Sequence, residues 1–116
     1  MNIYTIYNTT HQALFETFFK ISYDNINIQN KYKLIAVNEK DHSADCSFRD
    51  GPWKKLMRKK VDLILHAISE NTNPFLYADA DIVFLKDFKD KLLVDLKDKD
   101  ILSQKDPSGY CAGLFV

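Results

Sequence analysis

Several short apolar stretches along the chain have the character of buried strands. They are rich in β-branched and aromatic residues, which pack well on a pleated sheet. Three of them are residues 2–7 (NIYTIY), 33–37 (KLIAV) and 75–78 (FLYA). Two later stretches, DILSQ from Asp100 and AGLFV up to Val116, have the same character. The pattern therefore predicts five strands.

Helical periodicity fills the intervals between these stretches. Thr9, followed three residues later by Gln12, fits a capping box at the start of a first helix. Asp50-Gly51-Pro52 is a turn and helix-start signal for a second helix over residues 53–69, and a third is expected over residues 88–97. The apolar faces expected to be buried are Leu14, Phe15, Phe18 and Phe19 in the first helix; Trp53, Leu56, Met57, Val61, Ile64 and Ile68 in the second; and Phe88, Leu92, Leu93 and Leu96 in the third.

The order β-α-β-α-β-(α)-β-β predicts an α/β fold, and its crossovers are long enough for parallel strand pairing. Residues 1–116 contain no linker, repeat or low-complexity segment, so we expect one domain. The last residues lie inside an apolar run, which leads us to expect a partial domain.

Composition excludes several classes of protein. Hydrophobic residues make up 46% of the chain and charged residues 28%, which is typical of an ordered globular protein. Basic and acidic residues both number 16, so no net charge favours nucleic acid or a membrane surface. No stretch has the length of a transmembrane span, and no leader precedes the first strand, so the cytoplasm is the expected location. Cys46 and Cys111 have no partner pattern and are expected to be free thiols.

Two carboxylates follow the third predicted strand. Asp79 and Asp81 are separated only by Ala80, whose small side chain leaves room for a ligand. Ligands of parallel α/β sheets bind at the carboxyl ends of strands. Two carboxylates this close repel each other unless a cation or protons compensate, and Mg2+ or Mn2+ prefers oxygen ligands. The pattern therefore indicates a divalent metal with substrate phosphates in its open positions.

The simpler interpretation is that Asp79 and Asp81 are turn residues that face water. Against it, the apolar run at residues 82–85 (IVFL) follows at once, without the Gly, Pro or Asn of an ordinary turn. We therefore expect this run to return to the core and the carboxylates to have a functional role.

FLYADADIV also fits the motif of haloacid dehalogenase-type phosphatases, in which four apolar residues precede D-x-D-x-T/V. In that interpretation Asp79 is the nucleophile, Asp81 the acid/base and Val83 fills the last place. The motif of that family normally follows the first strand, whereas here a β-α-β-α unit precedes it. Its position therefore argues against a phosphatase.

The segment from Gly51 to Phe88, with D-A-D after its apolar strand, resembles the GT-A nucleotide-diphospho-sugar transferases, which include glycogenin-like enzymes. DILSQKD and GYCAGLFV are similar to the next two segments of that family. The resemblance implies a Rossmann-like, nucleotide-sugar-binding sheet flanked by helices, of which this chain covers the N-terminal half. It also implies a glycosyltransferase that moves a sugar from a UDP-sugar to an acceptor hydroxyl with Mn2+ or Mg2+.

The resemblance assigns roles to the two carboxylates and one lysine. Asp81 would be the principal metal ligand, and Asp79 would contact the metal, the ribose or both. Lys60 interrupts the apolar face of the second helix between Leu56 and Ile64, and the family has a lysine on this helix that approaches the donor. The alternative is that the stem of Lys60 packs while its ammonium reaches water. Lys59 takes its place if the register differs by one residue.

The remaining candidates come from strand ends. Asn8 and Thr9 follow the first strand, where the family holds the nucleobase and ribose, although Thr9 is equally explained as a helix cap. Gly113 matches the glycine of an N-A-G motif and would allow a close backbone approach, but Cys111 stands where the family has Asn. Gln104 and Asp106 are expected near the sugar pocket.

Other candidates have less support. We expect Trp53 to be a core residue, and the three histidines, His11, His42 and His66, to be surface or helix residues without ligand spacing. A catalytic base or nucleophile of the transfer has no candidate in this chain, and the acceptor is not indicated. A domain that binds the donor without catalysis therefore remains an alternative to an enzyme.

Overall fold

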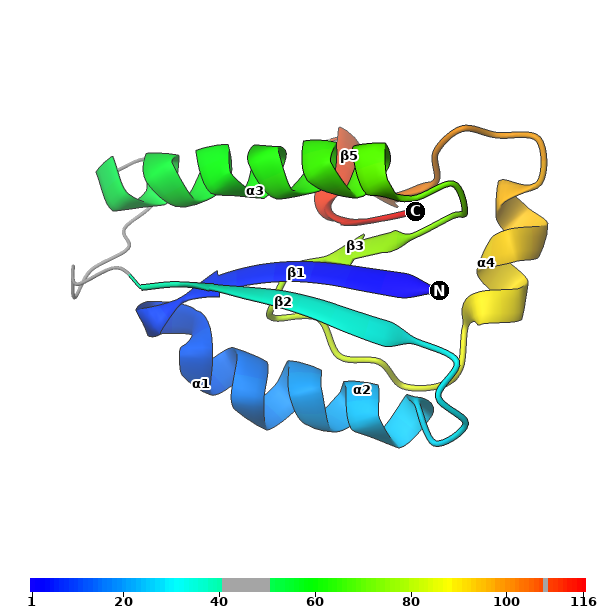
Figure 1. Ribbon diagram of the computed structural model, residues 1–116, viewed down its shortest axis with the longest axis horizontal. Helices are drawn as coiled ribbons and strands as arrows, with labels where there is room; N and C mark the ends of the chain where they lie inside the picture. The colour runs from blue at the N-terminus through cyan, green and yellow to red at the C-terminus, as the bar shows by residue number, and fades with distance from the viewer. Residues whose placement is uncertain (41–50, 108) are drawn as a thin grey trace.

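A five-stranded sheet lies at the centre of the molecule, with helices on both of its faces (Figure 1). We describe it from a computed structural model, which covers residues 1–40, 51–107 and 109–116; the side chain of Asp106 also lies outside the described part. In chain order the elements are β1 (Asn2–Asn8), η1 (Thr9–His11), α1 (Gln12–Leu14), η2 (Phe15–Phe19), α2 (Lys20–Ile26), β2 (Lys33–Glu39), α3 (Gly51–Glu70), β3 (Leu76–Ala78), α4 (Lys89–Leu96), β4 (Ser103–Asp106) and β5 (Gly109–Phe115).

The strand order β2-β1-β3-β5-β4 makes this a mixed sheet. β1 pairs in parallel with both β2 and β3, as the long crossovers predict. β5 inserts between β3 and β4 and runs antiparallel to both. The α/β fold class expected from the sequence is confirmed, and the architecture is consistent with a Rossmann-like nucleotide-sugar transferase fold. Because β1 and β3 are parallel neighbours, their carboxyl ends meet at one edge of the sheet.

Alternate residues of the strands pack against two helical layers. In Figure 1 the segment from η1 to α2 covers one face of the sheet and α3 covers the other. Leu76 and Ala78 of β3 belong to the core cluster that contains Phe15 and Phe19 of the first helical segment. Tyr77, which lies between them in sequence, belongs to the cluster under α3. The pleat therefore turns Tyr77, and two residues later Asp79, toward α3.

The buried face of α3 differs from the predicted apolar stripe. Its buried residues are Leu56, Lys60, Leu63 and Ala67. Val61 and Ile68, which were expected inside, are 53% and 59% exposed. Apolar residues surround this helix on several sides, so periodicity alone does not set its rotation. Ala67 is fully buried, and its small side chain allows the helix to lie close to the sheet.

The same correction applies to the other helices. Phe15 and Phe19 are buried as predicted, whereas Leu14 and Phe18 are 37% and 50% exposed. In α4 only Leu96 among its described residues is buried, and Leu93 is 38% exposed.

The start of the first helix is capped by a different residue from the one predicted. Oδ1 of Asn8 accepts a hydrogen bond from the backbone N–H of His11 at 3.1 Å, so Asn8 is the cap. Thr9 is exposed. Gln12 donates instead to Glu16 at 2.7 Å. The predicted capping box is wrong because the strand ends one residue later than expected, and the asparagine at its end reaches the free N–H group.

The run after the double carboxylate is a loop that stays largely at the surface. The backbone N–H of Ile82 donates to the carbonyl of Asp79 at 3.1 Å, which closes a tight turn without Gly, Pro or Asn. Phe84 is buried, but Val83 is 45% and Leu85 91% exposed. The expectation that residues 82–85 return to the core holds for Phe84 and is wrong for Leu85.

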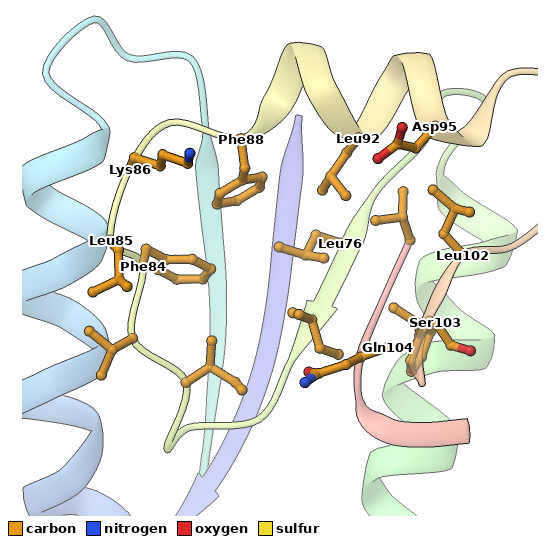
Figure 2. A pocket seen from close by; sticks show the side chains of 15 residues that line it. Leu76, Phe84, Leu85, Lys86, Phe88, Leu92, Asp95, Leu102, Ser103 and Gln104 are labelled. Atoms are coloured by element: carbon orange, nitrogen blue, oxygen red, sulfur yellow. The ribbon is translucent and has the colours of Figure 1, made fainter. Parts of the chain in front are cut away.

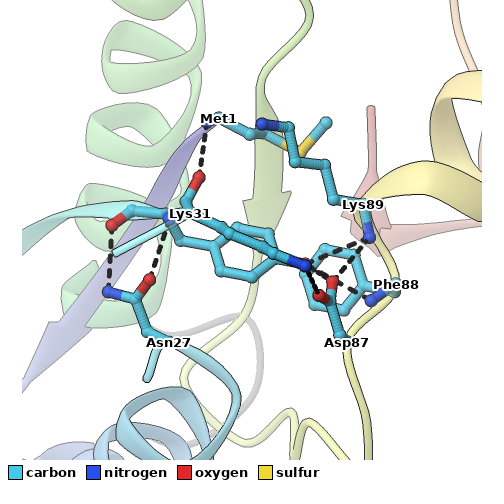
Figure 3. A network of polar contacts seen from close by, with 7 residues as sticks. Met1, Asn27, Lys31, Asp87, Phe88 and Lys89 are labelled. Atoms are coloured by element: carbon cyan, nitrogen blue, oxygen red, sulfur yellow. Dashed lines mark hydrogen bonds and ion pairs between the residues drawn. The ribbon is translucent and has the colours of Figure 1, made fainter. Parts of the chain in front are cut away.

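A polar network anchors the end of this loop (Figure 3). Asp87 accepts hydrogen bonds from Lys31 at 2.6 Å, from the hydroxyl of Tyr32 and from the backbone N–H of Lys89 at 3.2 Å. The bonds from Lys31 and Tyr32 lower the pKa of Asp87 well below its ordinary value. Burial, together with the bond to Asp87, raises the pKa of Tyr32 to about 12. The network joins the segment before β2 to the start of α4.

An apolar groove lies between this loop, α4 and the β4–β5 strands (Figure 2). Its volume is about 440 Å³, and Leu76, Phe84 and Leu114 contribute to its walls. Gln104, which was expected near the sugar pocket, points along this groove. Lys86 and Asp95 are the ionisable residues among its described lining. A groove of this composition does not suit a diphosphate.

Candidate functional site

A second cleft contains both carboxylates of the D-A-D motif. It lies where β1 and β3 end, beside the first turns of α3, and its volume is about 280 Å³. The lining residues are Ile6, His11, Trp53, Leu56, Met57, Tyr77, Asp79, Ala80 and Asp81. The structure therefore places the double carboxylate at a strand-end cleft, the position expected for a ligand site in an α/β sheet.

Asp79 is held by two side chains from its surroundings. Its Oδ1 atom lies 2.8 Å from Nζ of Lys60 and accepts a hydrogen bond of 2.8 Å from the hydroxyl of Tyr77. The side chain of Lys60 is only 10% exposed, whereas that of Asp79 is 38% exposed. Lys60 thus neutralises Asp79 from inside the protein, and the outer side of the carboxylate faces solvent.

Of the two lysines considered from the sequence, Lys60 is the one that lies beside the D-A-D motif. Lys60 belongs to the buried face of α3 and reaches the D-A-D motif, while Lys59 is exposed. In place of the free, solvated ammonium of the alternative interpretation, its ammonium binds Asp79 and lies 4.8 Å from the centre of the Tyr77 ring. The charge that interrupts the apolar face has a specific partner.

Gly113 approaches Asp79 from β5. The backbone N–H of Asp79 donates to the carbonyl of Gly113 at 2.7 Å. A Cβ atom on Gly113 would lie 2.8 Å from Oδ2 of Asp79, which is closer than real Cβ contacts allow. Glycine at this position therefore leaves room for the carboxylate itself.

Asp81 differs from Asp79 in its surroundings. Its side chain is exposed at the cleft, while the intervening Ala80 is 5% exposed and packs into the core. Burial raises the pKa of Tyr77, and the charge of Asp79, its hydrogen bond with Tyr77 and the charge of Asp81 raise this pKa further, so the hydroxyl stays a proton donor. Asp81 is the carboxylate that is open to a ligand.

The donor set suits a divalent cation that is shared with a substrate. Among the described residues, no group of three or more His, Cys, Asp or Glu side chains is placed to hold a metal ion. Mg2+ is commonly bound through one or two carboxylates, with substrate phosphates and water completing its shell. Asp81, with Asp79 beside it, fits that mode of binding.

Two aromatic residues of the cleft were not predicted as site residues. His11, expected to be a surface or helix residue without a site role, lies in η1 and lines the cleft, and its Nδ1 atom lies 2.8 Å from Oδ1 of Asn8. Trp53, expected in the core, is half-buried in the wall of the same cleft. Asn8 is 2% exposed and contacts His11, and neither Asn8 nor Thr9 is among the described residues that line the cleft. No local pattern marks His11, because it lies in η1, three residues after the end of β1, and reaches the cleft only through the parallel pairing of β1 with β3.

Other sequence candidates lie elsewhere. Cys111 is a free, half-buried thiol whose Sγ atom accepts from the backbone N–H of Gly113 at 3.4 Å. His66 is exposed on α3. Asp106 has its backbone in β4, but its side chain lies outside the described residues, as do His42 and Cys46.

Comparison with known proteins identifies the family. The family model of the nucleotide-diphospho-sugar transferases matches residues 15–109 of the 116-residue chain. The chain belongs to the nucleotide-diphospho-sugar transferase family. No curated protein and no solved structure gives a match. Membership of this family confirms the resemblance seen in the sequence, and it supports a glycosyltransferase-type enzyme that takes sugar from a nucleotide-sugar donor.

None of the helices within residues 1–40, 51–107 and 109–116 is both long and apolar enough to cross a lipid bilayer.

Proposed function

We propose that this chain is the donor-binding part of a metal-dependent glycosyltransferase, which transfers a hexose or pentose from a UDP-sugar to an acceptor hydroxyl. One observation carries the proposal: in a member of the nucleotide-diphospho-sugar transferase family, Asp79 and Asp81 line the strand-end cleft together with His11 and Trp53. The cleft thus combines carboxylates with flat aromatic surfaces. In this proposal the carboxylates bind the metal that accompanies the diphosphate, and the aromatic rings contact the nucleobase.

Charge explains why a metal belongs to the proposal. Lys60 neutralises Asp79, but Asp81 keeps an exposed negative charge at the cleft. A diphosphate next to Asp81 would be repelled unless a cation lies between them. Mn2+ or Mg2+, held by Asp81 and Asp79, would remove this repulsion and would act as a Lewis acid toward the departing diphosphate.

The chain's own residues have distinct tasks in this proposal. Lys60 supplies a positive charge beside Asp79, from a side chain that is 10% exposed, and this charge would attract the diphosphate of the donor. Trp53 and His11 offer surfaces for the nucleobase, and Asn8 holds His11 in place. Gly113, which has no Cβ atom, leaves room for the carboxylate of Asp79, and the small Ala80 separates the two carboxylates.

Calorimetric titration with UDP, with and without Mn2+, tests the proposal. We expect wild-type protein to bind UDP only weakly without metal and much more tightly with it. Asp81→Ala should abolish the metal-dependent part, and Asp62→Ala, an exposed acid of α3 outside the cleft lining, should not. Absence of nucleotide binding together with hydrolysis of p-nitrophenyl phosphate would instead indicate a phosphatase.

Assays with UDP-sugars separate an enzyme from a binding domain. Hydrolysis of a UDP-sugar, or transfer to an added acceptor, supports the catalytic interpretation. Binding of Mn2+–UDP with neither reaction would indicate a donor-binding domain without catalysis.

A further inference from the structure

Tyr77 has a hydroxyl at a position where packing requires only a ring. It lies in β3, its side chain is fully buried, and its ring belongs to the apolar cluster under α3. The hydroxyl donates to Oδ1 of Asp79 at 2.8 Å. A phenylalanine would fill the same space, so what the hydroxyl adds, among the described residues, is the contact with Asp79.

The ring of Tyr77 is held on two sides. It stacks on Phe115 of the neighbouring strand, with ring centres 5.2 Å apart and an angle of 20° between the planes. Nζ of Lys60 lies 4.8 Å from the ring centre. Tyr77 and Phe115 are also register partners across β3 and β5. The hydroxyl therefore has a fixed position before any ligand arrives.

The two bonds to Asp79 converge on one oxygen. Lys60 and Tyr77 both contact Oδ1, and Oδ2 takes part in no hydrogen bond with the described residues. Because two bonds fix Oδ1 of Asp79, its Oδ2 atom points in one defined direction. The backbone bond from Asp79 to Gly113 fixes the main chain of the same residue.

We propose that Tyr77 is a positioning residue, which orients Asp79 so that the carboxylate is ready for the metal-bound diphosphate of the donor. The inference rests on the proposed function and deepens it. When the donor enters, Lys60 has a second anion to contact, the diphosphate. The buried hydroxyl of Tyr77 donates to Oδ1 of Asp79 and continues to hold this atom. The hydroxyl thus preserves the orientation of Asp79 while its ion pair with Lys60 weakens.

A second buried tyrosine provides a matched control. Tyr4 is the register partner of Tyr77 on β1, is 5% exposed and packs in the same cluster. Its hydroxyl accepts a hydrogen bond from Asn71 at 2.8 Å and does not contact the cleft. Tyr4→Phe therefore removes an equivalent buried hydroxyl from the same layer without touching Asp79.

The experiment measures UDP affinity by calorimetry, with saturating Mn2+ and with EDTA, for wild type, Tyr77→Phe and Tyr4→Phe. We expect Tyr77→Phe to weaken Mn2+-dependent binding about tenfold, the effect of one hydrogen bond to a charged group. Metal-free UDP binding should stay at the wild-type value. Tyr4→Phe should bind as wild type does under both conditions. Thermal unfolding, recorded for all three proteins, verifies that each variant is folded.

Each other outcome overturns the inference. Wild-type affinity in Tyr77→Phe with Mn2+ means that the hydroxyl does not orient Asp79 for the donor. Equal weakening with and without Mn2+, or the same loss in Tyr4→Phe, means that it supports the fold alone. If wild-type protein itself shows no Mn2+-dependent UDP binding, the proposed function fails and this inference fails with it.

Discussion

The ammonium of Lys60 lies 2.8 Å from Oδ1 of Asp79 and joins the middle of α3 to the residue that follows β3. The two partners differ in burial, since 10% of the lysine side chain is exposed and 38% of the aspartate side chain. The lysine is thus the partner that depends on the pair, because it has little contact with water.

Removing Asp79 should cost more stability than removing Lys60. Asp79→Ala leaves two buried donors without their acceptor, the ammonium of Lys60 and the hydroxyl of Tyr77. We expect a loss of about 2 kcal/mol in the free energy of unfolding. Lys60→Met keeps the packing of the stem and leaves an aspartate that still contacts Tyr77 and water, so we expect a loss below about 1 kcal/mol.

Urea unfolding at neutral pH measures both values. Lys55→Met, which removes an exposed lysine of the same helix, is the control and should change stability little. An equal or larger loss for Lys60→Met than for Asp79→Ala would contradict the asymmetry.

Gly113→Ala should weaken donor binding without unfolding the protein. The added methyl would lie 2.8 Å from Oδ2 of Asp79, so the carboxylate has to turn away. The displaced atom is the end of a side chain, and we expect a stability loss of less than about 1 kcal/mol. The affinity for UDP with Mn2+ should fall at least tenfold, measured by calorimetry.

Gly51→Ala is the matched control for this substitution. A Cβ atom there meets no atom of the described residues within 4 Å, and the residue is exposed at the start of α3. Its affinity should equal that of wild type. If Gly113→Ala also binds UDP and Mn2+ with wild-type affinity, the position of Oδ2 of Asp79 does not affect donor binding.

The Asp87 network should contribute a distinct acid dependence to stability. The bonds from Lys31 and Tyr32 hold the folded-state pKa of Asp87 below the value near 4 of an unfolded chain. The resulting stabilisation is complete above that unfolded pKa and is lost as the pH falls below it. Asp87→Asn does not titrate, so it should be less stable than wild type at pH 7, and the difference should shrink toward pH 2.

Urea unfolding between pH 7 and pH 2 tests this dependence. Asp24→Asn breaks an exposed pair with Lys20 and should change the free energy of unfolding by no more than about 0.5 kcal/mol at pH 7. A constant difference between wild type and Asp87→Asn over the whole pH range would contradict the role given to Asp87.

The strand and helix order was predictable because each element carries its own local pattern. NIYTIY, KLIAV and FLYA are short, apolar and β-branched or aromatic, and all three become strands. The insertion of β5 between β3 and β4 was not predictable, because strand order depends on contacts between residues far apart in sequence. The rotation of α3 was also missed, since its apolar residues surround the helix.

The candidate site was predictable as far as local sequence specifies it. D-A-D after an apolar strand placed Asp79 and Asp81 at a strand end, and the charge inside an apolar stripe marked Lys60. Tyr77 had a readable signal as well, because residues two apart in a strand face the same side. His11 joins the cleft only through the parallel pairing of β1 with β3, which a single-sequence pattern does not specify.

Anomalous scattering from crystals grown with MnCl2 and UDP locates the metal relative to Asp79 and Asp81. We expect a manganese peak about 2 Å from a carboxylate oxygen of Asp81. The diphosphate should lie on the other side of the ion, with the uracil against Trp53 or His11. Manganese and UDP bound away from the cleft of Asp79 and Asp81, or a cleft that stays empty at saturating UDP and Mn2+, would contradict the proposed function.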